Sequence, residues 1–179
     1  MKIARLFKRL FLEASLLFCN DYNSYKIYKK SLGVTFGKHV RITGRIDFGS
    51  EPFLISIGDN VTITKGTRFI THDGGVGLFR NEFPGINIFG KITIKNNVFI
   101  GNNVIILPNI SVGNNVIIGV GSIVTKDIPD NVVVVGIPAR VIRTIEEYKQ
   151  NALKKAVYVS ENNFKKRKKL ILDIIAGKN

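Results

Sequence analysis

Aliphatic residues recur at every sixth position through the middle of this chain, with glycine and asparagine between them. The phrases IGNNVI, VGNNVI and IGVGSI each begin on such a residue. We call these positions anchors, and seven consecutive ones are Ile88, Ile94, Ile100, Ile106, Val112, Ile118 and Val124. A second column of small or branched residues follows four positions after each anchor: Ile92, Val98, Val104, Ile110, Val116, Ser122 and Ile128.

A period of six matches neither of the two common patterns of secondary structure. A helix would place apolar residues three and four apart, and a half-buried strand would alternate without recurrent Gly-Asn and Asn-Asn turns. We interpret each hexad as a short strand and a tight turn, because Gly and Asn tolerate the positive φ of such turns. Three hexads would close one triangular coil, and stacked coils would bury the anchors. The predicted fold is an all-β solenoid, a parallel β-helix.

The same spacing continues upstream, where two stretches interrupt it. The upstream anchors are Val34, Val40, Ile46, Ile57, Ile63 and Phe69. The stretch DFGSEPFLIS breaks the pattern before Ile57, and thirteen extra residues separate Phe69 from Ile88. We assign the extra residues to an inserted loop at 73–87, within the phrase THDGGVGLFRNEFPGIN. Insertions in solenoids usually gather on a binding face, so this loop is the first candidate for a site.

Both ends of the chain predict helices outside the repeat. Apolar residues in 2–18 recur every three or four positions, as in an amphipathic helix. This helix packs on protein or, as the alternative, lies against the inner membrane face. Thr144 and Glu147 have the spacing of a capping box, and Ser160 is a candidate start for another helix. The expected organisation is an N-terminal helical segment at 1–32, a β-helix domain at 33–143 and a C-terminal helical segment at 144–179.

The formal charge of +14 comes from the ends of the chain. Residues 1–32 carry a net +5 and residues 140–179 a net +7, which leaves +2 for the repeat between them. The repeat therefore lacks the basic excess of a nucleic-acid-binding face. The run from Lys165 to Lys169 is typical of a solvated helix face, and contact with a membrane or an acidic partner is the alternative.

The remaining composition points to a reducing compartment. Cys19 is the single cysteine, and no metal-ligand spacing occurs, so neither an intramolecular disulfide nor a metal is expected. The apolar stretch near the start is interrupted by Glu13 and has no cleavage pattern after it, so we expect a retained helix. No stretch approaches the roughly 18 apolar residues of a membrane span. We expect a cytoplasmic protein, with the inner face of the membrane as an alternative location.

The hexads, followed by GVGSIVTKDIPDNVVVVGIPARVIR at 119–143, resemble the left-handed β-helix acyltransferases. This hexapeptide-repeat group includes galactoside, maltose and Nod-factor O-acetyltransferases and many polysaccharide O-acetyltransferases. The resemblance implies a left-handed β-helix, a homotrimer with active sites in grooves between subunits, and acetyl-CoA as the acyl donor.

Acetyl transfer to a hydroxyl needs a base for the proton and donors for the developing oxyanion. The chain has two histidines, His39 and His72. His72, in FITHDGG at the mouth of the inserted loop, resembles the catalytic histidine of the galactoside and maltose enzymes. His39 lies in an ordinary hexad turn, and we expect a structural role for it. Neutral imidazole suits the work of a base at cytoplasmic pH.

Other site residues follow from the inserted loop and from the resemblance. Asp73 either binds the acceptor, orients the imidazole or caps the turn. The residues expected to contact the acceptor are Asp73, Arg80, Glu82 and Phe83. The positions that the resemblance assigns to acetyl-CoA are Gly119, Gly121 and Ser122 along the pantetheine arm and Thr125, Lys126, Arg140 and Arg143 near the phosphates. Lys and Arg suit phosphate chemically. The alternative is that these glycines serve only turns and the arginines only solubility.

Several other functions fit the sequence less well. A zinc carbonic anhydrase of the same architecture needs three histidines and this chain has two. A structural solenoid would have regular Thr-rich faces and no large loop. Serine acetyltransferases carry a long N-terminal helical domain, and common sugar-nucleotide N-acetyltransferases a Rossmann half, for which residues 1–33 are too short. We therefore predict an acetyl-CoA-dependent carbohydrate O-acetyltransferase in surface-polysaccharide assembly. N-acetylation of an amino-sugar nucleotide and serine O-acetylation are the alternatives.

Overall fold

The computed structural model describes residues 33–177, and the chain forms two compact units, one up to Glu146 and the other comprising Glu147–Asn179. The helix expected within residues 2–18 lies outside the described residues. The first unit contains the repeat, built from strands of two to six residues. In chain order they are β1 (Thr35–Phe36), β2 (Arg41–Thr43), β3 (Ile55–Ile57), β4 (Thr62–Thr64), β5 (Arg68–Phe69), β6 (His72–Asp73), β7 (Ile88–Phe89), β8 (Ile92–Ile94), β9 (Val98–Ile100), β10 (Ile105–Ile106), β11 (Ile110–Val112), β12 (Val116–Ile118), β13 (Ile123–Val124), β14 (Val132–Gly136) and β15 (Ala139–Thr144).

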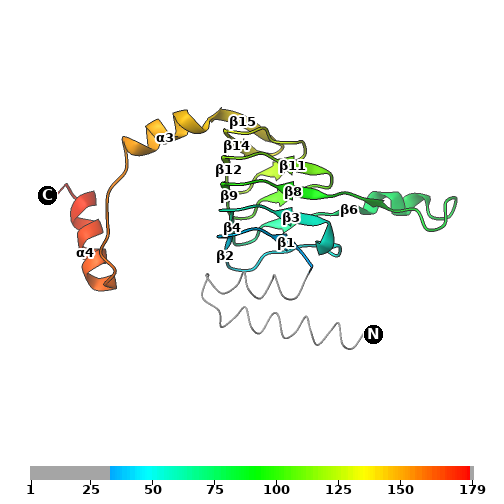
Figure 1. Ribbon diagram of the computed structural model, residues 1–179, viewed down its shortest axis with the longest axis horizontal. Coiled ribbons are helices and arrows are strands. Elements are labelled where there is room, and N and C mark those ends of the chain that lie inside the picture. Colours follow the sequence, from blue (N-terminus) through cyan, green and yellow to red (C-terminus); the bar gives the residue numbers. More distant parts are fainter. Residues whose placement is uncertain (1–32, 178–179) are drawn as a thin grey trace. The chain divides into compact units, whose positions relative to one another are not determined.

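The strands other than β6 and β7 form three sheets, and each sheet takes its strands from successive coils that lie one above another (Figure 1). The sheet orders are β1-β3-β8-β11, β13-β10-β5 and β15-β14-β12-β9-β4-β2. All pairs in them are parallel except β14 with β15. Ile92 pairs with Ile110 and Val98 with Val116, each eighteen residues later. The chain therefore returns to the same sheet after three hexads, which confirms the predicted parallel strands.

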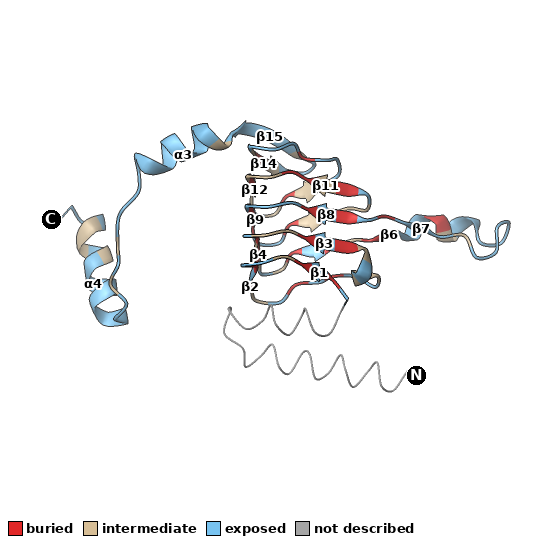
Figure 2. Cartoon of the chain, in the orientation of Figure 1, coloured by how far each residue is buried: buried red, intermediate tan, exposed pale blue. Residues whose placement is uncertain are grey.

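The core consists of the predicted anchors and the second column, buried inside the stack (Figure 2). Every upstream anchor is buried, and so is every anchor from Ile94 onward. Ile88 is the one anchor that the sequence analysis assigned wrongly, because its side chain is 44% exposed. It lies in β7, which pairs antiparallel with β6 outside the stack, and the six-residue frame resumes only at β8.

One corner of the stack is built from residues with positive φ. These residues are His39, Asn60, Asn97, Asn115 and Asn131. Asn tolerates this conformation better than most residues, and the amides of Asn97, Asn115 and Asn131 also hydrogen-bond from one coil to the next. His39 takes the Asn position in the first of these coils, with φ of 55°. Its place at a turn is the one that the sequence analysis expected.

The C-terminal helices are present, but one of their boundaries and one strand differ from expectation. Helix α3 spans Ile145–Leu153 and helix α4 spans Phe164–Ile175. Ser160 is not the start of α4, because Asn163 caps that helix by accepting from the backbone N–H groups of Lys165 and Lys166. The unexpected strand is β15, which covers the edge of β14.

Within residues 33–177, none of the helices has the length and apolar character needed to cross a bilayer.

Candidate active site

His72 lies at the base of a hairpin that projects from the stack (Figure 1). We call this hairpin, His72–Phe89, the arm; β6 and β7 form its base, and a 3-10 helix, η2 (Gly74–Phe79), begins directly after β6. The preceding Thr71 is fully buried, whereas 44% of the His72 side chain is exposed. The change from core to arm thus occurs at His72, and it leaves the imidazole open to a substrate.

The irregular stretch 47–56 brings a carboxylate to this histidine. Phe48 is buried and its ring stacks on that of Phe69, with 5.2 Å between centroids. The backbone then turns at Gly49, whose φ is 67° and whose N–H donates to Asp47 Oδ1 over 3.0 Å. A Cβ at Gly49 would lie 2.9 Å from the Phe69 carbonyl oxygen, so only glycine fits there. This turn places Ser50 and Glu51 beside the end of the neighbouring strand.

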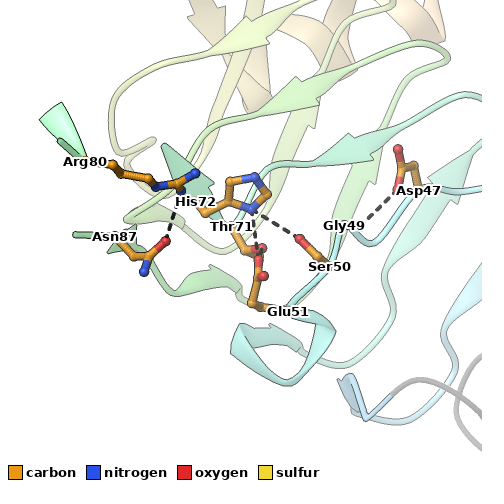
Figure 3. Close-up of polar contacts among 8 residues, drawn as sticks. All are labelled: Asp47, Gly49, Ser50, Glu51, Thr71, His72, Arg80 and Asn87. Carbon is orange, nitrogen blue, oxygen red and sulfur yellow. Dashed lines mark hydrogen bonds and ion pairs between the residues drawn. The ribbon is translucent and has the colours of Figure 1, made fainter. Parts of the chain in front are cut away.

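Glu51 holds His72 by one ring nitrogen (Figure 3). His72 Nδ1 lies 2.9 Å from Glu51 Oε2, and the Thr71 hydroxyl donates to the same oxygen over 2.7 Å. Ser50 Oγ lies 3.2 Å from Nδ1. Because an ionised carboxylate can only accept, the proton of a neutral imidazole resides on Nδ1. No described residue hydrogen-bonds Nε2, so its lone pair remains available.

The hydrogen bond from Thr71 lowers the pKa of Glu51, and contacts with His72 and Ser50 add to this while partial burial opposes it. The carboxylate is therefore charged throughout the neutral range. It contributes stability above the ordinary pKa of glutamate, and this contribution is lost as the pH falls through the lowered value.

Chemically, this arrangement is suited to a general base with an orienting carboxylate. A base must reach the proton it removes, and Nε2 is the ring atom left free to do so. The carboxylate also stabilises the imidazolium that forms when the ring takes a proton. Within residues 33–177, no group of three or more His, Cys, Asp and Glu side chains is placed to hold a metal ion.

The expected acceptor residues extend from this centre along the arm. Asp73 accepts from the Gly75 N–H over 2.8 Å and caps η2, so Glu51 and not Asp73 contacts the imidazole. Arg80 donates to Asn87 Oδ1 over 3.4 Å, and the two side chains are drawn in Figure 3. Glu82 is exposed, as is Phe83 at 58%.

The positions assigned to acetyl-CoA lie on the last coils of the repeat. Gly119 permits close packing of these coils, because a Cβ there would lie 2.5 Å from Val135 Cγ1. The Ser122 hydroxyl is buried; it donates to the Gly119 carbonyl and accepts from the Gly136 N–H. Gly121 has φ of 69° at a turn. Thr125, Lys126, Arg140 and Arg143 are exposed.

The cationic members of this group are chemically suited to phosphate. Among the residues that the structure describes, no carboxylate forms an ion pair with Lys126, Arg140 or Arg143. The guanidinium of Arg140 donates a hydrogen bond to the backbone carbonyl of Ala139. Because these cations form no ion pair with a described carboxylate, they can bind an anionic ligand without first breaking an ion pair within the protein.

Sequence reasoning missed Glu51, the residue whose carboxylate contacts His72 Nδ1. Glu51 lies in DFGSEPFLIS, where the six-residue spacing breaks down. Without that spacing, the place of each residue in its coil cannot be read from the sequence. The available signal was an acidic residue in an irregular coil directly preceding the coil that carries His72.

Comparisons with known proteins place these features in a wider context. A family model described as bacterial transferase hexapeptide (six repeats) matches residues 91–126. Protein CapG of Staphylococcus aureus is 48% identical over 168 residues, which cover 93% of this chain and 95% of that protein. Galactoside O-acetyltransferase of Escherichia coli strain K12 is 46% identical over 103 residues, which cover 54% of this chain and 47% of that protein.

The fold is likewise similar to that of a solved acetyltransferase. The structure of a galactoside acetyltransferase in complex with coenzyme A matches with a TM-score of 0.51 and 30% sequence identity. The match covers 88% of each chain.

Proposed function

The chain belongs to the hexapeptide-repeat family of bacterial transferases, and from this premise we propose that it is an acetyl-CoA-dependent O-acetyltransferase. We propose a carbohydrate hydroxyl, in a surface polysaccharide or its precursor, as the acceptor. The observation that carries the proposal is the Nδ1 contact of His72 with Glu51, which leaves Nε2 free at the base of the arm. The names of the galactoside relatives support the class of acceptor.

In the proposed reaction His72 Nε2 takes the hydroxyl proton as the acceptor oxygen attacks the thioester carbonyl carbon. Glu51 stabilises the resulting imidazolium through Nδ1. The tetrahedral intermediate then collapses, the carbon–sulfur bond breaks, and the Nε2 proton passes to the departing thiolate. The products are an acetyl ester and free CoA, and His72 returns to its neutral form.

The acyl donor would lie along the last coils. Gly119, Gly121 and Ser122 would contact the pantetheine arm through their backbone, since the Ser122 hydroxyl is already used within the protein. Lys126, Arg140 and Arg143 would pair with the phosphates, with Thr125 nearby. The coenzyme A complex of the similar galactoside enzyme supports this choice of donor.

We further propose that the repeat is a left-handed β-helix and that three copies assemble around a three-fold axis. The outer surfaces of the sheets differ in a way that supports assembly. The first sheet presents a column of hydroxyl residues: Thr35, Ser56, Thr93 and Ser111. At the outward-facing positions of the other two sheets the paired residues are apolar: Phe99 with Ile117 and Ile105 with Ile123. Phe99 is 45% exposed, and burial of such columns favours association.

Assembly should therefore be required for activity, because the groove would use residues from two copies. Phe99→Glu should lower the average mass seen by light scattering and reduce acetyl transfer in parallel. Thr93→Glu, on the hydroxyl column, is the matched control and should leave the mass unchanged. A fully active monomer would contradict the proposed assembly.

Glu51→Gln should lower kcat roughly 10- to 10²-fold, part of the full general-base contribution. The amide can present a donor to Nδ1, which moves the imidazole proton to Nε2 and removes the base. The KM for acetyl-CoA should stay unchanged. The variant should be less thermally stable than wild type at neutral pH. This difference should disappear in acid, because the Glu51 carboxyl of wild type is then protonated in both the folded and the unfolded state.

Asp59→Asn serves as the control for this variant. It replaces one carboxylate by an amide of the same size. Asp59 accepts a hydrogen bond from a backbone N–H, and Asn96 and Asn114 do the same at the equivalent positions of the next coils. Equal effects of the two substitutions on kcat would show that Glu51 does not act through His72.

The acceptor class is tested with labelled acetyl-CoA and a panel of sugars, polysaccharide fragments, amino-sugar nucleotides and serine. Label should enter an ester of a saccharide, released by mild alkali. Preferential labelling of serine, or an alkali-stable amide on an amino-sugar nucleotide, would overturn the proposed acceptor while leaving acetyl transfer itself intact.

A further inference from the structure

The second compact unit has apolar side chains but no core. None of residues 147–177 is buried. The large apolar side chains that are most exposed are Val157 at 59%, Tyr158 at 86%, Phe164 at 79%, Leu172 at 55% and Ile175 at 77%. In the repeat, by contrast, the anchors from Ile94 onward are at most 1% exposed. Exposed apolar surface on this scale is typical of a segment that binds something else.

Helix α4 concentrates this apolar surface on one side. With about 3.6 residues per turn, one side of α4 carries Phe164, Leu170, Ile171, Ile174 and Ile175. The opposite side carries Lys165, Lys166 and Lys169 together with Asp173, and Leu172 lies at the boundary between the two sides. Arg167 and Lys168 fall among or beside the apolar residues, where long side chains can extend their charged ends away from an apolar phase.

The charge of the unit decides between possible occupants of this surface. Residues 147–179 carry nine Lys and Arg against three acids, a net +6. A second copy of α4 would bring the same positive charge, and residues 1–32 are also basic at +5. Both would meet electrostatic repulsion, whereas an anionic surface would be attracted.

We propose that α4 docks the protein on the surface of a bilayer rich in anionic phospholipid. A helix in the membrane interface buries its apolar side among the upper acyl chains and keeps Lys and Arg at the head groups. The α4 sequence meets both requirements within twelve residues. Each basic residue near such a surface adds attraction that is screened by salt. None of the α4 residues takes part in the proposed reaction, so the inference does not depend on the proposed function.

The test is sedimentation of the full chain with vesicles of phosphatidylcholine, with or without phosphatidylglycerol. Wild-type protein should pellet with the anionic vesicles, remain in solution with phosphatidylcholine alone, and dissociate as salt is raised. The combined variant Lys165→Gln, Lys166→Gln and Lys169→Gln should partition roughly 100-fold more weakly. Phe164→Ser with Ile175→Ser should weaken partition by at least about tenfold.

The matched control is Lys38→Gln, Lys65→Gln and Lys91→Gln, which removes the same charge from exposed positions on the repeat. It should retain vesicle binding. Because none of the changed α4 residues is buried, all variants should keep the wild-type thermal midpoint and acetyl-transfer rate in solution.

Three results of the vesicle assay would overturn the inference. They are no binding of wild-type protein to anionic vesicles, equal loss in the repeat control, and unchanged binding in both α4 variants. A concentration-dependent change in mass that the α4 variants abolish would assign the surface to contact between copies and would also overturn it. If the protein binds anionic vesicles as expected but transfers no acetyl group, the proposed function is contradicted and the inference about α4 stands.

Discussion

His72→Ala is expected to lower turnover by about 10² to 10⁴-fold, which is the usual contribution of a positioned general base. His72 Nε2 has no hydrogen-bond partner among the described residues. On the other side of the ring Nδ1 contacts Glu51, which also accepts from the Thr71 hydroxyl. Removing the imidazole leaves the acceptor hydroxyl with no base. Binding of CoA, measured by calorimetry, should be unchanged, because the residues proposed for the donor lie on later coils.

The control is His39→Asn, which removes the other histidine of the chain. Asn is the residue found at the equivalent positive-φ corner in later coils, as at Asn60 and Asn97, so this substitution avoids backbone strain. It should leave kcat within about twofold of wild type, as expected for a residue outside the reacting centre. Near-normal turnover in the His72→Ala protein, or a comparable loss of turnover in His39→Asn, would contradict the assignment of His72 as the general base.

Replacing residues 76–86 by a two-residue turn is expected to lower acetylation of the acceptor about 10²-fold or more while sparing CoA binding. The replacement removes the exposed aromatic, cationic and acidic side chains of the arm: Phe79, Arg80, Glu82 and Phe83. Aromatic faces can stack on a sugar ring, and the charged groups can hydrogen-bond its hydroxyls. Without them the acceptor would lose its alignment beside His72.

The shortened arm can keep its base, because the pairing of β6 with β7 through His72–Phe89 and Asp73–Ile88 lies outside the replaced residues. Leu78→Ser is the matched control within the arm, since this side chain is 85% exposed and has no polar group for a sugar. Both proteins should bind CoA normally in calorimetry. Unchanged sugar acetylation after the replacement would show that the acceptor does not use the arm.

The parts of the fold that could be predicted are those that repeat locally. Each anchor from Ile94 onward is buried where the six-residue spacing placed it, because a hexad adds one strand and one turn and thus brings the next anchor to the same depth. The break in this spacing also located the arm and the exposed His72. Where the spacing was extended across the insertion it failed, since Ile88 belongs to the arm hairpin.

The same reasoning explains the two differences near the C-terminal end. β15 pairs antiparallel with β14 and so follows no six-residue period, which left it without a repeat signal. The start of α4 depends on which polar side chain meets two backbone N–H groups, and the structure shows that this is Asn163 and not Ser160.

The sequence by itself determined the repeat, its core, the arm and the histidine, because all of these follow from spacing along the chain. Only the tertiary structure decided what acts on that histidine. Glu51 precedes His72 by twenty-one residues and reaches it because Phe48 stacks on Phe69 and the chain turns at Gly49, which joins two neighbouring coils at this point. This contact depends on packing and on a local turn of irregular length, and no period along the chain specifies it.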